Sequence, residues 1–312
     1  MSAQQRKIDQ TRAYGLSDQR QTKLSRLEIE RLLKQALAED KGKKGDITVK
    51  ALFPKNFSIN GKVIAKSSGV ICGLDIARMV FQILSPLIKV EQLVQEGERV
   101  KPGQIVAKIE GPVREVLIGE RTALNFLQRL SGIATITRKF VQSAGQAKIL
   151  DTRKTTPNLR ILEKYAVRIG GGINHRFGPS DLILIKDNHL AALQKTKKIS
   201  KIQAIRLAIS LARKKVGTKQ LIEVEITNWQ EAMVAYQAGA DILMFDNASS
   251  EEVRKFVANL GKDRKKVILE WSGGINLEKI RRIRPLLVDW ISVGKLTHSA
   301  PALDFSLKIL PK

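Results

Sequence analysis

The chain has 312 residues, 43% of them hydrophobic, so it can bury a sizeable core as one large domain or two moderate ones. Its formal net charge of +25 favours anionic partners, both acidic metabolites and nucleic acids, and says nothing about the fold. The sequence shows no apolar stretch long enough to span a membrane, and because its first fifteen residues contain no apolar block we expect no secretory signal. Because the single cysteine, Cys72, cannot form an internal disulfide, we expect a reducing compartment, the cytoplasm.

The first part of the chain predicts a loose arm followed by a small α+β domain. Residues 1–22 are polar and lack periodicity, which predicts an arm without regular structure. A helical stripe of leucines over 24–39 ends before the glycines of GKKGD. Residues 47–118 alternate short β-type runs with Gly and Pro turns, interrupted by one helix at about 74–84. We therefore place an N-terminal α+β domain at 23–118.

From Gly119 onward, the sequence predicts an α/β domain. A long helix is expected over 119–143, and helical patterns at 202–215 and 229–238 fill gaps between short apolar runs. The runs are 148–150, 182–185, 221–224, 242–245, 267–269 and 290–293. Alternating strands and helices indicate a parallel sheet, and about six such units favour an incomplete barrel at 119–296. No GxGxxG opens a helix after a strand, so a dinucleotide site is not supported. Residues 297–312 are expected to pack back on the N-terminal domain.

Polar residues follow each apolar run, where the carboxyl ends of parallel strands converge on one face. They are Asp151, Thr152, Arg153 and Lys154; Lys186, Asp187, Asn188 and His189; Glu225; Asp246 and Asn247; Ser272, Gly273 and Gly274; and Gly294 with His298. All three histidines, His175, His189 and His298, fall in or just after these segments. Crowded cations repel one another unless an anion sits among them. The pattern predicts a pocket for a polyanionic small molecule.

Taken singly, these motifs leave alternatives open. Arg153 with Lys154 suits a carboxylate beside a phosphate, or is a solvated loop. Glu225 and Asp246 suit ribose hydroxyls, Mg²⁺ or general acid/base work, or form ion pairs with lysines. Small residues after a strand, as in the SGG at 272–274, bring backbone amides towards a phosphate, or form a plain turn.

Together, a set of motifs resembles the quinolinate phosphoribosyltransferases over about residues 24–310. The matching stretches are AEDKGKKGDIT, GERTALNFLQRLSGIAT, DTRKTTPNLR, EKYAVRIGGGINHR, LIKDNH, IEVEI, MFDN, WSGGIN and SVGKLTHSAPALDFSL. The resemblance implies an N-terminal open-faced sandwich and a C-terminal barrel-like domain. It also implies that quinolinate and phosphoribosyl pyrophosphate react, with Mg²⁺, to give nicotinate mononucleotide, pyrophosphate and CO₂.

The resemblance further implies roles for individual residues. Quinolinate is expected to meet Arg153, His175, Arg176 and Lys186, with Arg121 reaching in from the second subunit of a homodimer. The donor and its metal are expected to meet Lys154, Glu225, Asp246, Ser272, Gly273, Gly294 and His298, and Thr152 and Gly274 are expected among the substrate-binding residues. Of these residues, Lys154, Lys186, Glu225 and Asp246 are predicted to carry catalysis, and Glu225 and Asp246 to hold Mg²⁺.

Two residues depart from the family pattern, and two other functions compete with this one. Trp271 stands before SGG where the family usually has a small residue, and Pro179 stands where leucine is common. A related phosphoribosyltransferase for another aromatic carboxylate is the nearer alternative. The net charge of +25 suggests the other alternative, a nucleic-acid-binding protein on an inactive scaffold.

Overall fold

The computed structural model describes residues 26–218, 220–283 and 288–311, which form two compact units. The predicted arm at 1–22 lies outside the described residues. The parallel-sheet unit contains Lys139–Lys154 and Gly172–Lys295, and the antiparallel-sheet unit contains Thr22–Arg138, Thr155–Gly171 and Leu296–Lys312. None of the described helices combines the length and apolarity that a bilayer crossing requires.

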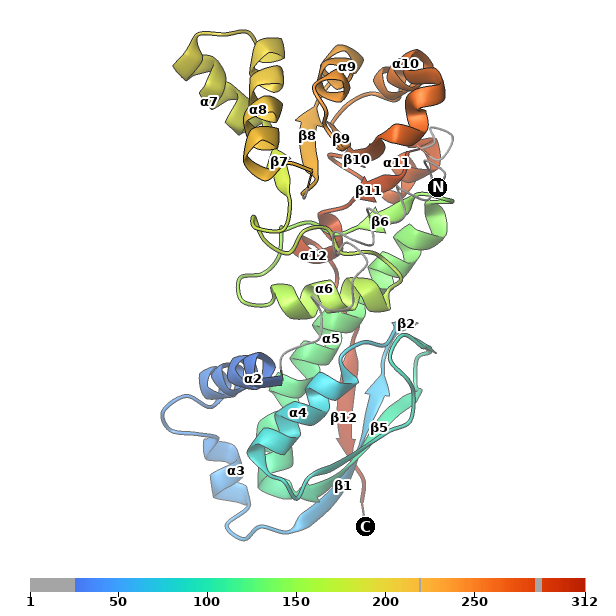
Figure 1. Cartoon of the computed structure of the whole chain (residues 1–312). Helices are drawn as coiled ribbons and strands as arrows, with labels where there is room; N and C mark the ends of the chain where they lie inside the picture. Colours follow the sequence, from blue (N-terminus) through green and yellow to red (C-terminus); the bar gives the residue numbers. More distant parts are fainter. Residues whose placement is uncertain (1–25, 219, 284–287, 312) are drawn as a thin grey trace. The chain divides into compact units, whose positions relative to one another are not determined.

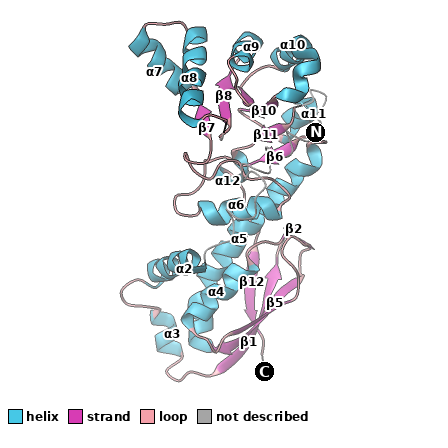
Figure 2. Ribbon diagram, in the orientation of Figure 1, coloured by secondary structure: helices cyan, strands magenta, loops and turns pink. Residues whose placement is uncertain are grey.

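The antiparallel-sheet unit is built on a four-stranded sheet with the order β12-β1-β5-β3 and a separate β2-β4 ribbon (Figure 2). The strands are β1 (Ser58–Ala65), β2 (Gly69–Val70), β3 (Lys89–Gln92), β4 (Arg99–Val100), β5 (Ile105–Pro112) and β12 (Phe305–Ile309). Along β1, Gly61, Val63 and Ala65 are buried while the residues between them are not, so only one face of this strand is covered. This is the α+β architecture that the sequence predicts for this region.

Two helices in this unit confirm the sequence pattern, and one corrects it. Between residues 26 and 171, the described helices are α2 (Arg26–Lys41), α3 (Ile47–Leu52), α4 (Leu74–Leu84), α5 (Val113–Ser143) and α6 (Arg160–Ile169). The predictions for 24–39 and 74–84 are confirmed by α2 and α4. The expected start of the long helix at Gly119 is wrong, since α5 begins six residues earlier, at Val113. Val113 and Val116 are both buried at helical spacing, and the Arg114 Nε donates to the Phe53 carbonyl at 2.6 Å. These contacts override the β preference of the valines.

The parallel-sheet unit confirms the predicted succession of six strands. Its sheet has the order β6-β11-β10-β9-β8-β7, an incomplete barrel whose edge strands do not pair with each other (Figure 1). The strands are β6 (Lys148–Leu150), β7 (Ile183–Ile185), β8 (Ile222–Ile226), β9 (Ile242–Asp246), β10 (Ile268–Ser272) and β11 (Trp290–Ser292). The connecting helices are α7 (Asp187–Lys197), α8 (Lys201–Val216), α9 (Trp229–Gln237), α10 (Ser250–Leu260), the 3₁₀ helix η2 (Gly261–Lys266) and α11 (Leu277–Ile283).

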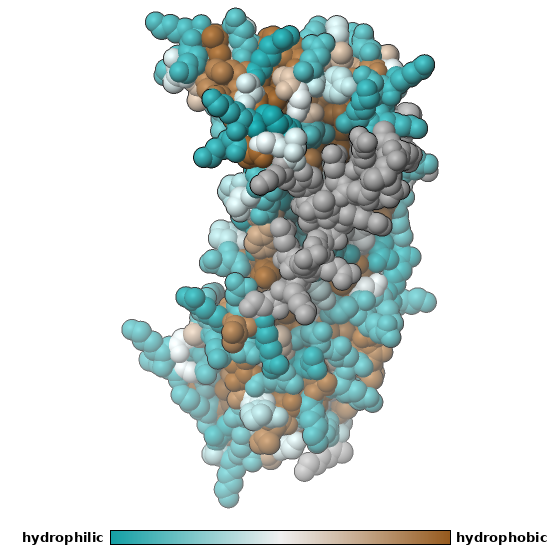
Figure 3. Space-filling view, viewed as in Figure 1, coloured by the Kyte–Doolittle hydropathy of each residue, from teal (hydrophilic) through white to brown (hydrophobic). Residues whose placement is uncertain are grey.

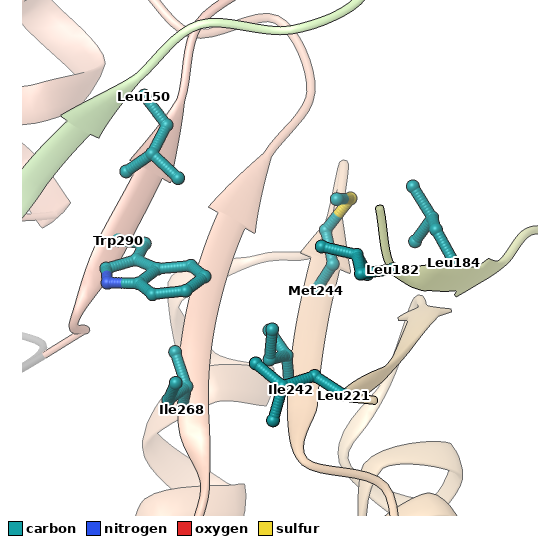
Figure 4. Close-up of a cluster of buried hydrophobic side chains, with 8 residues drawn as sticks. All are labelled: Leu150, Leu182, Leu184, Leu221, Ile242, Met244, Ile268 and Trp290. Atoms are coloured by element: carbon teal, nitrogen blue, oxygen red, sulfur yellow. The ribbon is translucent and has the colours of Figure 1, made fainter. Parts of the chain in front are cut away.

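Both faces of these strands are buried, and one hydrophobic cluster of this unit lies on a single face. Eight buried side chains form it: Leu150, Leu182, Leu184, Leu221, Ile242, Met244, Ile268 and Trp290 (Figure 4). On the view in Figure 3, hydrophilic side chains predominate on the outer helices α7 to α10, in keeping with the basic composition. Because side chains alternate along a strand, the residues two places beyond this core share its face at the carboxyl edge of the sheet.

Candidate active site at the carboxyl edge of the parallel sheet

Alternation and register bring the predicted strand-end residues together. On β10, Ile268, Glu270 and Ser272 share one face, while the intervening residues point the other way. Ser272 pairs in register with Asp246, the last residue of β9. Six residues lie at this edge in the spatial order of their strands, and we call them the row: Thr152, Gly294, Ser272, Asp246, Glu225 and Lys186. The register shifts the row by two residues between β11 and β10 and again between β9 and β8. The sheet therefore collects residues from six separate positions in the sequence into one row.

Opposite charges meet at the β7–β9 end of this row. Glu225 is half-buried, and its Oε2 accepts the Asp187 amide hydrogen at 3.2 Å. Burial raises the pKa of Glu225; the Asp187 amide and the Lys186 ammonium oppose the shift, and the Asp246 carboxylate reinforces it. Because the Glu225 and Asp246 carboxylates influence each other, a bound cation would stabilise both of them. The nearby Lys186 ammonium can bind an anion.

Cations gather at the β6 end of the row. Arg153 and Lys154 are exposed in the turn after β6, where the Lys154 amide donates to Thr152 Oγ1 at 3.1 Å. Burial lowers the pKa of Arg176, the Glu223 carboxylate opposes that shift, and the positive charge of Arg153 adds to it. Arg153 and Arg176 are therefore within electrostatic range of each other, as the anion-pocket hypothesis requires.

The segment that carries His175 and Arg176 is anchored beside β6. Ile173 forms a parallel bridge with Leu150, which places the segment next to that strand. The buried Asp151 carboxylate accepts the His175 amide hydrogen at 2.9 Å and the Asn174 Nδ2 at 2.6 Å. The Arg176 Nη1 donates to the Leu182 carbonyl at 3.2 Å. Side-chain and backbone bonds together fix this segment against the strand ends.

His175 reaches a buried pair of glutamates that the sequence reasoning missed. Its Nε2 lies 3.2 Å from Oε2 of Glu223 and 3.5 Å from Oε2 of Glu270, and all three side chains are buried. Burial alone lowers the pKa of His175, but the two carboxylates outweigh it and raise that pKa to about 10. The Arg176 amide donates to Nδ1 at 2.8 Å, so Nδ1 does not carry a proton. We assign the proton that the raised pKa implies to the group made of Nε2 and the two carboxylates. The signal was present: each glutamate stands two residues before a strand-end site residue.

The loops after β9 and β10 interlock. The Asn247 amide donates to the Ser272 carbonyl at 3.1 Å. Gly273 has φ +90°, and a Cβ on it would lie 2.5 Å from the Asn247 amide nitrogen. Only glycine combines this backbone conformation with so close an approach. Gly273 thus allows the backbone of Asn247 to approach the SGG motif closely. Ser272 keeps its place in the row.

Trp271 faces away from the row, because it alternates with Ser272 along β10. It lines a cavity of about 340 Å³ together with Ser249, Asn276 and Lys279. The Lys279 Nζ lies 5.9 Å from the Trp271 ring centroid and donates to the Gly273 carbonyl at 2.6 Å. Trp271 therefore packs behind the loop and does not belong to the row.

Some of the residues singled out in the sequence lie outside the row and have other contacts. His189 Nδ1 accepts the Lys186 amide hydrogen at 2.9 Å, so this histidine caps the start of α7. Gly170, the first glycine of the stretch EKYAVRIGGGINHR, ends α6, and a Cβ on it would lie 2.7 Å from the Ala134 carbonyl oxygen, so close helix packing explains this glycine. Arg121, exposed on α5, and His298, in the short helix α12 (Lys295–His298), belong to the antiparallel-sheet unit.

Comparison with known proteins identifies the family. Residues 46–131 match the model of the quinolinate phosphoribosyl transferase N-terminal domain, and residues 133–308 match that of its C-terminal domain. The probable nicotinate-nucleotide pyrophosphorylase (carboxylating) of Bacillus subtilis (strain 168) is 42% identical over 288 residues, which cover 92% of this chain and 95% of the relative. The chloroplastic nicotinate-nucleotide pyrophosphorylase (carboxylating) of Arabidopsis thaliana is 36% identical over 294 residues, covering 90% and 83% of the two chains.

A solved structure agrees with these matches. The nicotinate-nucleotide pyrophosphorylase from Francisella tularensis superposes with a TM-score of 0.82 and 37% sequence identity, covering 93% of this chain and 98% of that one. Sequence and fold thus give the same assignment over nearly the whole length. The chain belongs to the quinolinate phosphoribosyltransferase family, in both its N-terminal and its C-terminal domain.

Proposed function

We propose that this protein transfers the phosphoribosyl group of phosphoribosyl pyrophosphate to quinolinate, with loss of CO₂, to make nicotinate mononucleotide for NAD biosynthesis. The observation that carries the proposal is the row at the sheet edge, where Lys186, Glu225, Asp246 and Ser272 stand together in a family member. Quinolinate has two carboxylates and the donor has two phosphate-containing groups. The cations beside the row match that charge.

The proposed roles follow from where the charges lie. Arg153, Arg176 and Lys186 form the quinolinate side of the site, and His175, whose ring nitrogens face Glu223, Glu270 and the Arg176 amide, supports that side from beneath. We assign to the donor side Thr152, Lys154, Glu225, Asp246, Ser272, Gly273, Gly274 and Gly294, which lie at or just after the ends of strands of the parallel sheet. Among these residues, we assign the catalytic roles to Lys154, Lys186, Glu225 and Asp246. His298 is added to the donor side on the family resemblance alone.

The reaction needs both signs of charge. The quinolinate ring nitrogen bonds to the anomeric carbon as the bond from that carbon to pyrophosphate breaks and its electron pair leaves with pyrophosphate. Carboxylates stabilise the positive charge that develops on the ribose, and Lys154 and Lys186 stabilise the departing and bound anions. The ring nitrogen then carries positive charge, so the carbon beside it can release CO₂ and take up a proton. Positioning and charge therefore account for the chemistry without a protein nucleophile.

Glu225 and Asp246 fit a magnesium ion. They stand at the ends of adjacent strands, and Asp246 contributes to the raised pKa of Glu225. Carboxylate oxygens are the ligands that Mg²⁺ prefers, and the ion keeps several waters when few protein ligands are present. Bound there, Mg²⁺ would neutralise charge on the pyrophosphate group.

A turnover assay tests the proposal. Quinolinate or nicotinate is incubated with phosphoribosyl pyrophosphate, with Mg²⁺ or with EDTA, and pyrophosphate and CO₂ are followed. We expect equal amounts of the two products from quinolinate, only when Mg²⁺ is present. Turnover of nicotinate without a response to quinolinate would support the alternative phosphoribosyltransferase. Activity unaffected by EDTA would remove the metal from the proposal.

We also propose that the active form is a homodimer in which Arg121 serves the site of the neighbouring subunit. Arg121 is exposed on α5, as a residue that crosses to another subunit must be before assembly. Arg121→Ala and Arg153→Ala are each expected to be inactive. When the two variants are mixed and allowed to exchange subunits, activity should return, because a hybrid dimer contains one site with both arginines. A mixture that stays inactive despite exchange, shown by a tagged subunit, would contradict the crossing.

The other functions considered for this sequence are separated by simple measurements. A nucleic-acid-binding protein on an inactive scaffold would show no turnover and a steep loss of gel-shift affinity with added salt. The presence of the whole charged row in a family member favours the enzyme. The cytoplasmic location stays a prediction, which fractionation of the source cells checks.

A further inference from the structure

A buried polar cluster lies directly beneath the proposed site. It consists of His175, Glu223 and Glu270, and we call it the His175 cluster. Glu223 stands two residues before Glu225 on β8, and Glu270 two residues before Ser272 on β10. By alternation, both glutamates share the face of the row and lie one layer deeper. Neither of them belongs to the predicted site.

The two glutamates are buried with few hydrogen bonds, of which one joins His175 Nε2 to Oε1 of Glu223 at 3.4 Å. Both are 0% exposed, and His175 is 6% exposed. Within the described residues, three carboxylate oxygens of this pair accept no hydrogen bond: Oε2 of Glu223 and both oxygens of Glu270. Their compensation is electrostatic: His175 faces both, and Arg176 adds its charge near Glu223. Burying a carboxylate with so few hydrogen bonds costs free energy of folding, so we look for a function of these residues other than stability.

We propose that Glu223 and Glu270 are positioning residues for quinolinate binding, acting through His175 on Arg176. The inference rests on the proposed function. The His175 ring is held from both sides: Nε2 faces the two carboxylates, and Nδ1 accepts the amide hydrogen of Arg176 at 2.8 Å. A rotation of the ring would break both sets of contacts. The carboxylates therefore fix the ring, and the ring fixes the backbone from which the Arg176 side chain extends.

The geometry favours a proton over a metal ion in the cluster. The three ligand atoms lie within 4.8 Å of one another, a spacing that a divalent cation also accepts. A metal would need the lone pair of Nε2, yet Nδ1 already accepts the Arg176 amide hydrogen, which leaves the ring proton on Nε2. The Nε2–H then donates to Oε1 of Glu223 at 3.4 Å, and Oε2 of Glu270 lies 3.5 Å from the same nitrogen.

The test uses Glu270→Gln and Glu223→Gln, which keep the shape of the side chain and remove its charge. We expect both proteins to fold, with KM for quinolinate raised about 10-fold or more while KM for phosphoribosyl pyrophosphate is unchanged. The matched control is Glu231→Gln, which removes another buried carboxylate, paired with Lys201 at 2.7 Å on the outer helices. It should leave both KM values unchanged. If one of the two cluster variants does not fold, the other decides the matter.

A double-mutant cycle tests whether the glutamates act through His175. The change in KM for quinolinate caused by Glu270→Gln should largely vanish in a His175→Gln background. Unchanged KM values in both glutamine variants, equal increases for both substrates, or additive effects in the cycle would overturn the inference. So would a stoichiometric transition metal in the purified protein that His175→Gln removes. If the unmodified protein does not turn over quinolinate, the proposed function itself has failed; turnover with unaffected variants removes only this inference.

Discussion

Arg153→Ala is expected to lower the affinity for quinolinate by about 100-fold or more, because a guanidinium that pairs with a carboxylate contributes strongly and specifically to binding. The side chain is exposed in the turn after β6 and within electrostatic range of Arg176. Its loss removes charge from the pocket without opening a cavity. The melting temperature should therefore stay the same. Isothermal titration calorimetry with quinolinate measures the effect.

A matched substitution separates a local role from general charge. Arg206 is also an exposed arginine, on α8, far in sequence from the strand ends. Arg206→Ala lowers the net charge by the same amount and should leave quinolinate affinity unchanged. If the two variants lose affinity equally, the basic surface as a whole attracts the ligand, and Arg153 has no specific part. Unaltered affinity in Arg153→Ala would refute its role outright.

Gly273→Ala is expected to abolish donor binding. The methyl group would be placed 2.5 Å from the Asn247 amide nitrogen, and the residue has φ +90°. Backbone strain of this kind costs about 1–3 kcal/mol, and relieving the clash must push the loops after β9 and β10 apart. Since a misplacement of about 1 Å can cost about 100-fold in rate, kcat/KM for phosphoribosyl pyrophosphate should fall at least that far.

The control for this variant is Gly239→Ala. Gly239 has nearly the same conformation, φ +94°, but a Cβ there would have nothing within 4 Å. This variant should lose some stability to backbone strain alone and keep its kinetic constants. Thermal melting and steady-state kinetics on both proteins separate the two effects. Normal kinetics in Gly273→Ala would show that the interlocked loops do not shape the donor site.

The sequence patterns predict the strands better than they predict the helix starts. All six parallel strands appear within a few residues of the apolar runs, since buried parallel strands are short and continuously hydrophobic. The start of α5 at Val113 was missed because two valines mimic a strand when only local preference is considered. Their burial at helical spacing becomes visible only with the packing.

The sequence predicts the strand-end residues of the candidate site but not the buried glutamates beneath them. Strand-end residues such as Lys186 and Asp246 could be placed from the sequence, because carboxyl ends of parallel strands meet at one edge. The spacing of Glu223 and Glu270, each two residues before a strand-end residue, places them on the same face, but a glutamate inside an apolar run indicates burial and not its partner. The partner, His175, comes from a distant segment, and only the fold brings the three together.

The central claim is that one site at the carboxyl edge of the parallel sheet binds quinolinate. A crystal structure of the protein with quinolinate tests it most directly. We predict that the two carboxylates of the ligand lie against Arg153, Arg176 and Lys186, above the row that contains Glu225 and Asp246. Quinolinate bound elsewhere on the protein, with this edge vacant, would contradict the claim.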